Sequence, residues 1–275
     1  MGRLSRDKRD VFYRRAKEMG YRARSAFKLL QLNSEFQFLS EGRTQRAVDL
    51  CAAPGSWSQV LSEHVQQLVA VDLQPMAPLD GVICLQGDIT SSDTAHAILR
   101  EFNNQYADLV VCDGAPDVTG LHDVDDYLQG QLLLSALALS THLLREGGTF
   151  VAKIFRHKNV GLLYSQLRLL FRRVSVAKPS ASRNSSSEAF VVCEEFIGGC
   201  KLPLGNSADT FDIGNLSPCA VPFIVCGDLS GFSTPGLDMD ANKSYPIDPG
   251  FDNKPIQSPI QPPYEIAKER AKQSS

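Results

Sequence analysis

The stretch Ala47-Val48-Asp49-Leu50-Cys51-Ala52-Ala53-Pro54-Gly55-Ser56-Trp57 decides the fold class of this chain. A short apolar run that favours a strand ends at Asp49-Leu50, and small residues with a proline then turn the backbone sharply. An amphipathic helical pattern follows from Ser56. A strand, a tight loop and a helix N-terminus in this order are typical of the edge at which an open α/β sheet holds a nucleotide-like ligand.

The same alternation continues along the chain on the C-terminal side of this stretch. Short apolar runs that favour strands alternate with segments of helical periodicity. The expected strands are residues 47–50, 68–72, 82–85, 109–113, 149–154, 174–177 and 189–194, and the expected helices are residues 25–36, 58–64, 93–102, 124–144 and 161–171. This rhythm predicts an α/β fold with a doubly wound, seven-stranded, mostly parallel sheet and helices on both faces.

Charge is distributed unevenly over the 275 residues, although the net charge is only −3. Residues 1–28 contain ten Lys or Arg against three Asp or Glu, so the rest of the chain is acidic. A basic arm that also carries aromatic residues suits a polyanionic partner, and a solvated tail is the plain alternative. We therefore divide the chain into a basic arm and helix suited to binding nucleic acid (1–36), an α/β domain that carries the expected ligand site (37–199) and a C-terminal tail (200–275).

The tail is distinguished by its composition. Residues 200–275 hold ten of the fifteen prolines together with many Gly, Ser and Asp, which is typical of extended chain with little helix. Within it, Val221 to Cys226 is a short apolar run suited to docking on the body, and Gln261 to Tyr264 is rich in proline. A segment that docks a partner and plain disorder are both compatible with this composition.

Composition also indicates the compartment and the absence of a metal. No apolar run is long enough to span a bilayer, and the N-terminus is basic where a signal peptide would be apolar. The seven cysteines include no Cys-x-x-Cys pair, which favours reduced, buried thiols, and the five histidines lack ligand spacing. We expect a cytoplasmic protein without a membrane segment and without a metal site.

The first loop has the wrong glycine content for a dinucleotide. A pyrophosphate site needs Gly-x-Gly-x-x-Gly, whereas this loop has Gly55 alone. Asp72 ends the second expected strand where a ribose-binding acid belongs, and Asp88 follows the third, within reach of an adenine edge. S-adenosylmethionine fits this set better than NAD, although single aspartates commonly end strands as turn formers. Trp57 suits either ligand contact or packing of the helix on the sheet.

Four further charged residues come from distant parts of the chain. Asp113 follows the apolar strand at 109–112, and Lys153 lies within another apolar run. Glu188 opens the last expected strand and Lys28 lies on the first expected helix. Each has a plain alternative: a turn former, a lysine at a sheet edge and two surface charges.

Several motifs together resemble the FtsJ/RrmJ family of ribose 2′-O-methyltransferases. They are the first loop extended to Gln59, Asp113-Gly-Ala-Pro-Asp117, Lys153 in Val-Ala-Lys-Ile-Phe, and Ser-Ser-Glu-Ala-Phe around Glu188. The stretches Gly20 to Lys28, Pro116 to Asp126, Val221 to Ser230 and Ser244-Tyr-Pro246 resemble the eukaryotic branch that acts on the tRNA anticodon loop. The resemblance covers roughly residues 1 to 195 and implies a Rossmann-like class I methyltransferase fold.

The resemblance also implies roles for individual residues. The family's Lys-Asp-Lys-Glu tetrad falls on Lys28, Asp113, Lys153 and Glu188, and its S-adenosyl-L-methionine contacts fall on Gly55, Trp57, Asp72, Asp88 and Asp113. The implied substrate is ribose at nucleotides 32 and 34 of tRNA, and not DNA. The implied partners are a WD-repeat helper protein and a helical-repeat helper protein.

The residues leave two questions open. Burial and a neighbouring Lys28 would lower the pKa of Lys153, whereas Asp113 and Glu188 would raise it, so the protonation state of Lys153 is undetermined. Catalytic residues also do not encode the RNA address, so ribosomal RNA or an mRNA cap are alternative substrates. A non-catalytic RNA-binding protein with a methyltransferase fold and a dinucleotide-dependent oxidoreductase are the alternatives from other classes.

Overall fold

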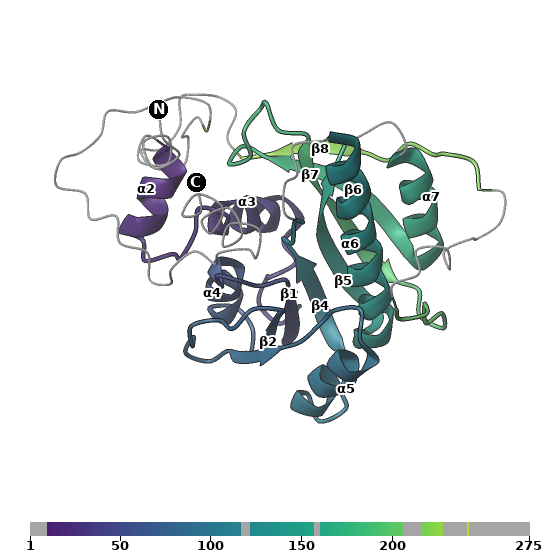
Figure 1. Ribbon diagram of the computed structural model, residues 1–275, viewed down its shortest axis with the longest axis horizontal. Coiled ribbons are helices and arrows are strands. Elements are labelled where there is room, and N and C mark those ends of the chain that lie inside the picture. Colours follow the sequence, from purple (N-terminus) through teal and green to yellow (C-terminus); the bar gives the residue numbers. More distant parts are fainter. Residues whose placement is uncertain (1–9, 117–121, 157–159, 206–215, 228–240, 242–275) are drawn as a thin grey trace, which may run out of the picture.

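Eight strands form one mixed sheet through the middle of the protein (Figure 1). The computed structural model describes residues 10–116, 122–156, 160–205, 216–227 and residue 241. The strands are β1 (Arg46–Leu50), β2 (Gln67–Asp72), β3 (Ile83–Gln86), β4 (Ala107–Cys112), β5 (Leu144–Phe155), β6 (Phe171–Pro179), β7 (Glu188–Phe196) and β8 (Phe223–Cys226). Apolar residues dominate these runs, and the central strands are buried almost throughout.

The strand order is β3-β2-β1-β4-β5-β7-β6-β8. The first five strands in this order are parallel, and β7 is antiparallel to both of its neighbours, β5 and β6. The order reverses between β1 and β4, which pair directly with Leu50 opposite Cys112. Ligands of open α/β sheets bind outside the carboxyl ends of the strands at such a reversal.

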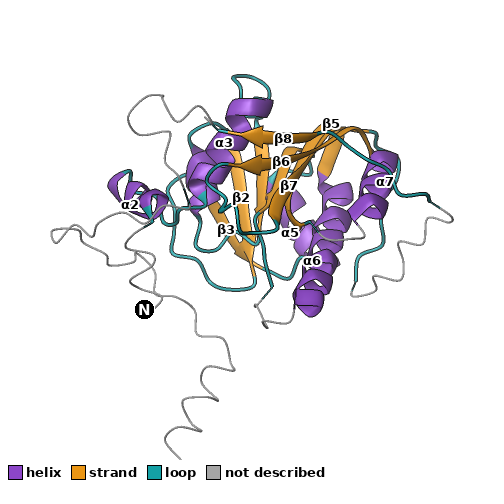
Figure 2. Ribbon diagram, turned by 90° about the horizontal axis from the view of Figure 1, so that it is seen from above, coloured by secondary structure: helices purple, strands orange, loops and turns teal. Residues whose placement is uncertain are grey.

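Helices cover both faces of the sheet, as predicted (Figures 1 and 2). They are α2 (Val11–Glu18), α3 (Ala26–Phe36), α4 (Ser56–Ser62), α5 (Ser92–Glu101), α6 (His122–Leu143) and α7 (Val160–Leu170). The apolar sides of α3 and α4 share one core with α2 and one face of the sheet. The other core lies between the opposite face and α5, α6 and α7. Each helix therefore buries an apolar stripe, which fixes the loops at the strand ends.

The number of strands is the main correction to the predicted fold. All seven predicted strands are present, and β8 is an eighth that comes from the proline-rich region after residue 200. It pairs in parallel with the sheet-edge strand β6, with Phe223 opposite Val176. A four-residue run surrounded by irregular chain has too little periodicity to predict its own pairing, which here depends on the open edge of β6.

The arm is more ordered than its composition indicated. Residues 11–18 form α2, whose N-terminal amide on Tyr13 is capped by the Asp10 side chain at 3.0 Å. Phe12 and Tyr21 are buried and their rings contact Phe27 of α3. These two aromatic residues of the arm therefore pack on the body of the protein.

Two further contacts and bounds concern the helices. Ser25 stands at the N-terminal boundary of α3 without capping it, and its hydroxyl hydrogen-bonds that of Ser56 at 2.6 Å. Helix α6 begins at His122. Residues 1–9, residues 117–121 of the Pro116–Asp126 stretch, Ser244-Tyr-Pro246 and the run from 261 to 264 lie outside the described residues. Among the described helices, none combines the length and the apolar character needed to cross a membrane.

Candidate active site

Four charged side chains that are far apart in the sequence meet at the carboxyl end of the parallel strands. Lys28 comes from α3, Asp113 directly follows β4, Lys153 lies near the end of β5, and Glu188 begins β7 opposite Phe155. The Lys153 Nζ lies 2.9 Å from Asp113 Oδ1, and the Lys28 Nζ lies 2.9 Å from Glu188 Oε2. The crossed distances are 3.8 Å from Lys28 to Asp113 and 4.0 Å from Lys153 to Glu188. We call these four residues the charged cluster.

Lys153 is the most deeply enclosed cation of the charged cluster. Only 8% of the residue is exposed, and its ammonium also donates a hydrogen bond of 2.6 Å to the backbone carbonyl of Asp113. Burial lowers the pKa of Lys153, but the carboxylates of Asp113 and Glu188 outweigh burial and the net shift is upward. The ammonium form is therefore favoured, which settles the question of its charge that the sequence left open.

Glu188 is held as a carboxylate by its surroundings. Burial would raise its pKa, yet Lys28, Lys153 and a 2.6 Å hydrogen bond from the Ser182 hydroxyl together lower the pKa to about 2. The backbone on either side is fixed as well, because the Lys178 ammonium donates to the carbonyls of Ser186 and Glu188. Glu188 thus orients both lysines of the charged cluster while it is itself held from the 182–186 loop.

The first loop approaches its neighbours very closely. Gly55 has a φ of +102°, and a Cβ there would lie 2.9 Å from the Leu79 side chain. The Arg22 guanidinium joins this loop to the chain after β2 by donating to the carbonyls of Pro54, Ala77 and Pro78. Glycine is favoured at position 55, since other residues would be strained at this φ and would displace the end of the Leu79 side chain.

Trp57 has a structural position. It is 2% exposed, contacts the ring of Phe190, and donates its indole N–H to the carbonyl of Ser25. The side chain therefore packs the first turn of α4 on the sheet, which was the plain alternative for this residue. Because the side chain is buried, a cofactor would contact Trp57 through the backbone of that turn.

Asp72 and Asp88 lie at the ends of neighbouring strands, as the parallel pairing of β2 and β3 requires. The Asp72 carboxylate accepts hydrogen bonds from the backbone amides of Ala53 and Gln74, which ties the end of β2 to the first loop. Asp88 is exposed two residues beyond β3, and its Oδ1 accepts from Thr90. The Asp72 carboxylate therefore borders the first loop, and Asp88 follows the next strand on the same side of the switch point.

A third acid at this edge was not singled out from the sequence. Asp49 is 1% exposed at the end of β1, and its carboxylate accepts a 2.6 Å hydrogen bond from the Ser58 hydroxyl. Burial raises its pKa to about 7, and the carboxylates of Asp113 and Asp72 add to the increase. Negative charge is therefore concentrated around the first loop. The position within an apolar strand gave no signal beyond that of an ordinary strand residue.

Two other supporting residues were also missed. Gln129 of α6 is buried and donates its amide to the carbonyls of Gly114 and Lys153, so it holds the chain after β4 against β5. Asp10 binds the arm to the loop that leads to Glu188, since it pairs with both Arg24 and Arg183. Neither residue type is rare in ordinary helices and turns, so only contacts between distant segments reveal these roles.

Among the described residues, no group of three or more His, Cys, Asp or Glu side chains is arranged to hold a metal ion. What the arrangement can do is hold a hydroxyl-bearing substrate beside a bound ligand. Lys28 and Lys153 supply ammonium groups from two directions, and the first loop lies across the adjacent strand end.

Known proteins are similar to this chain in sequence and in fold. The model of the FtsJ-like methyltransferase family matches residues 21–196. The tRNA (cytidine(32)/guanosine(34)-2′-O)-methyltransferase of Mus musculus is 58% identical over an alignment of 284 positions, which covers 97% of this chain and 86% of that protein. The enzyme of the same name from Schizosaccharomyces pombe is 54% identical over 97% of this chain and 96% of its own length.

Among solved structures, a Plasmodium falciparum protein described as a ribosomal RNA methyltransferase has a TM-score of 0.59. It is 24% identical, and the match covers 65% of this chain and all of that one. At this identity the likeness concerns the fold, which both chains share.

Proposed function

The chain belongs to the FtsJ-like methyltransferase family, and from that premise we propose that it methylates ribose 2′-hydroxyls of tRNA at positions 32 and 34 of the anticodon loop. The observation that carries this proposal is the charged cluster, in which Lys28, Asp113, Lys153 and Glu188 converge within ion-pair distance. The relatives named for these two tRNA positions match the chain over nearly its whole length.

We propose S-adenosyl-L-methionine as the methyl donor. Gly55, the backbone at Trp57, Asp72, Asp88 and Asp113 are the groups that would hold it. The carboxyl groups around the first loop fit this ligand, because the Asp72 carboxylate, and Asp49 when it is ionised, suit a sulfonium cation. When bound, S-adenosyl-L-methionine supplies the methyl group that is transferred.

In this proposal Lys153 orients the ribose hydroxyl and does not act as its base at rest. Its pKa is raised, so the ammonium persists at neutral pH and can donate a hydrogen bond to the 2′-oxygen. Methyl transfer needs the oxygen aligned with the methyl carbon, and fixed alignment contributes a large part of such rate enhancements. The oxygen–carbon bond would form as the carbon–sulfur bond breaks, and the hydroxyl proton would leave late in the reaction to solvent water.

The other three residues of the charged cluster position Lys153 and the substrate. The Asp113 carboxylate forms an ion pair with the Lys153 ammonium at 2.9 Å and borders the first loop, so it links the cofactor side to the hydroxyl side. Glu188 accepts from Lys28 at 2.9 Å and keeps it beside the same space. A cluster of four paired charges of which every member is partly or wholly buried supports catalysis over a purely structural RNA-binding role.

We further propose that helper proteins direct the enzyme to its two positions, a WD-repeat protein for one and a helical-repeat protein for the other. The support is the family resemblance, together with a charged cluster that contains nothing able to read an anticodon. All seven cysteines are free thiols, which supports a cytoplasmic location.

The decisive experiment measures methyl transfer directly. The full chain is incubated with labelled S-adenosyl-L-methionine and total tRNA, with and without each helper, and the methylated riboses are mapped. We expect label at ribose 32 or 34, depending on the helper. Label only in ribosomal RNA or capped mRNA, offered in parallel, would replace the proposed substrate, and no label in any RNA would contradict the enzymatic function.

A further inference from the structure

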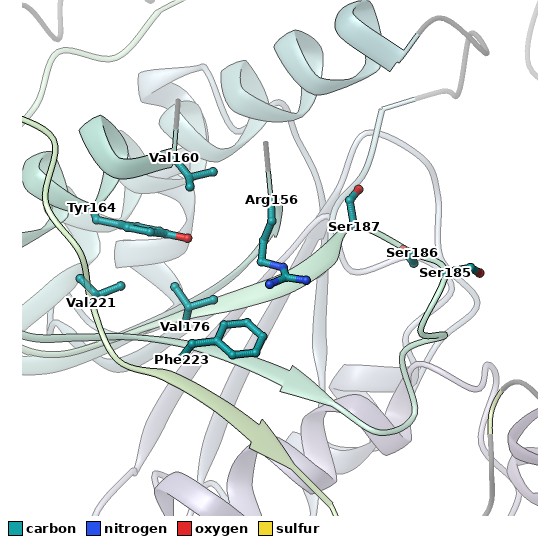
Figure 3. A pocket seen from close by; sticks show the side chains of 9 residues that line it. All are labelled: Arg156, Val160, Tyr164, Val176, Ser185, Ser186, Ser187, Val221 and Phe223. Atoms are coloured by element: carbon teal, nitrogen blue, oxygen red, sulfur yellow. The ribbon is translucent and has the colours of Figure 1, made fainter. Parts of the chain in front are cut away.

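An open pocket of about 600 Å³ lies beside the charged cluster, on the side away from the first loop. Figure 3 shows Arg156, Tyr164 and Phe223 around its centre, with Val160, Val176 and Val221 completing the apolar walls. The pocket brings together β5, α7, β6 and the β8 region. The mechanism above uses none of these side chains, and of them only Val221 and Phe223 lie in a stretch that carries the family resemblance.

The pocket combines a cation with aromatic rings. The Arg156 guanidinium lies 4.6 Å from the centre of the Phe223 ring, which is 46% exposed, so the stacked pair is accessible to solvent. Burial raises the pKa of Tyr164 and the nearby Arg156 acts against this shift, whereas burial and Arg156 both lower the pKa of Lys178. No carboxylate is among the described residues that line the pocket, and Arg156 is the charged residue among them.

The pocket is continuous with the charged cluster through the backbone. Ser185, Ser186 and Ser187 form one wall and lead directly into Glu188. The amide of Arg156 donates to the carbonyl of Ser187 at 3.0 Å, which ties the end of β5 to this wall. Arg156 and Ser187 therefore join the pocket to Lys153 and Glu188 along β5 and β7, within reach of a polymer whose ribose lies at Lys153.

We propose that the pocket binds a nucleotide of the RNA substrate that neighbours the methylated one, with the base against Phe223 and a phosphate at Arg156. Single-stranded RNA is recognised by stacking of its bases on aromatic or guanidinium planes and by cations at its phosphates. The apolar walls and the accessible ring suit any of the four bases. This inference rests on the proposed function, since it takes RNA as the substrate.

The test measures the binding of an anticodon stem-loop RNA to the full chain by fluorescence anisotropy. Phe223→Leu keeps an apolar side chain and removes the ring, and we expect it to weaken binding about tenfold or more. Phe223→Trp should bind as tightly as the unsubstituted chain. Arg156→Gln should weaken binding and reduce the slope of log K against log salt by about one, whereas Arg156→Lys should retain the slope.

The chain contains a matched control pair. The Lys201 ammonium lies 5.9 Å from the centre of the exposed Tyr106 ring, next to the start of β4 and thus at the opposite end of the strands. Tyr106→Leu and Lys201→Gln remove the same kinds of group, and we expect RNA binding to stay within twofold. Melting temperatures of all variants verify that β8 and the sheet remain folded.

The outcomes separate this inference from the proposed function. If the unsubstituted chain binds and methylates tRNA while Phe223→Leu and Arg156→Gln bind it equally well, the pocket assignment is wrong and the methyltransferase function stands. If these variants lose a helper protein but keep RNA affinity, the pocket docks a protein and the inference is also wrong. Failure of the unsubstituted chain to bind the RNA would overturn both.

Discussion

Two carboxyl groups at the same edge of the sheet have pKa values that are shifted in opposite directions. Asp49, under the first loop, has a Ser58 hydroxyl and two other carboxylates around it, and its pKa is raised to about 7. Glu188, in the charged cluster, faces Lys28 and Lys153, and its pKa is lowered to about 2. Burial raises the pKa of both acids, so the neighbouring cations make the difference.

The difference separates the two halves of the proposed reaction. The region around Asp49 accumulates negative charge and is suited to a cationic cofactor, whereas every charge of the cluster has a partner of opposite sign. A pre-arranged, neutralised cluster can orient a neutral hydroxyl without reorganisation. One edge of one sheet thus holds a site for a cation beside a site for a hydroxyl.

The largest expected effect comes from removing the central cation of the cluster. Lys153→Ala should lower methyl transfer about 10³-fold or more, because the hydroxyl loses its orienting donor and Asp113 loses its partner. Affinity for S-adenosyl-L-methionine, measured by calorimetry, should change little. Lys153→Met retains the length of the side chain and should be equally inactive. Near-normal turnover in either variant would remove Lys153 from the mechanism.

Glu188→Gln should break the charge balance of the cluster with the next largest effect. We expect a loss of activity of about 10²-fold and a lower melting temperature at neutral pH, since two buried ammonium groups lose a carboxylate. A carboxyl whose pKa falls from 4.5 to about 2 stabilises the fold above about pH 4.5 and loses this contribution as pH falls towards 2. Between pH 6 and pH 3 the melting temperature of the unsubstituted chain should therefore fall more steeply with pH than that of Glu188→Gln. Identical slopes of melting temperature against pH would contradict this assignment.

On the cofactor side, Gly55→Ala should weaken the binding of S-adenosyl-L-methionine about tenfold. The new Cβ would be strained at a φ of +102° and would lie 2.9 Å from Leu79. Gly42→Ala is the matched control, because Gly42 also has a positive φ but nothing lies within 4 Å of its Cβ position. We expect Gly42→Ala to lower stability alone. Equal affinity losses in both variants would show that strain, and not the close approach at position 55, is responsible.

The smallest expected effect tests Asp49 itself. A bound cation favours the carboxylate form, which predominates above about pH 7, so affinity for S-adenosyl-L-methionine should rise severalfold between pH 6 and pH 8. Asp49→Asn should lose this part of the pH dependence, as calorimetry across that range can measure. Because the cofactor ionises in the same way with both chains, the difference between the two pH profiles reports the contribution of Asp49 alone. Parallel pH profiles for the two chains would refute a role for Asp49.

The sequence alone determined much of this molecule. Alternating apolar runs marked the seven strands of the central sheet and the helices between them, because burial on both faces requires continuous apolar runs. Specific motifs named Lys28, Asp113, Lys153 and Glu188 in advance, and the tertiary structure brings these four together. The single glycine of the first loop already argued against a pyrophosphate.

Only the tertiary structure decided the properties that depend on contacts between distant segments. The pKa of Lys153 is raised because the carboxylates of Asp113 and Glu188 outweigh burial. The distances from Lys153 to these two carboxylates cannot be known from the residue types alone. The eighth strand needs the open edge of β6, and the Arg156–Phe223 pair needs that strand in place. The apolar pattern of a segment predicts which of its sides is buried. The pKa values and the strand pairing depend instead on which distant segments pack against it.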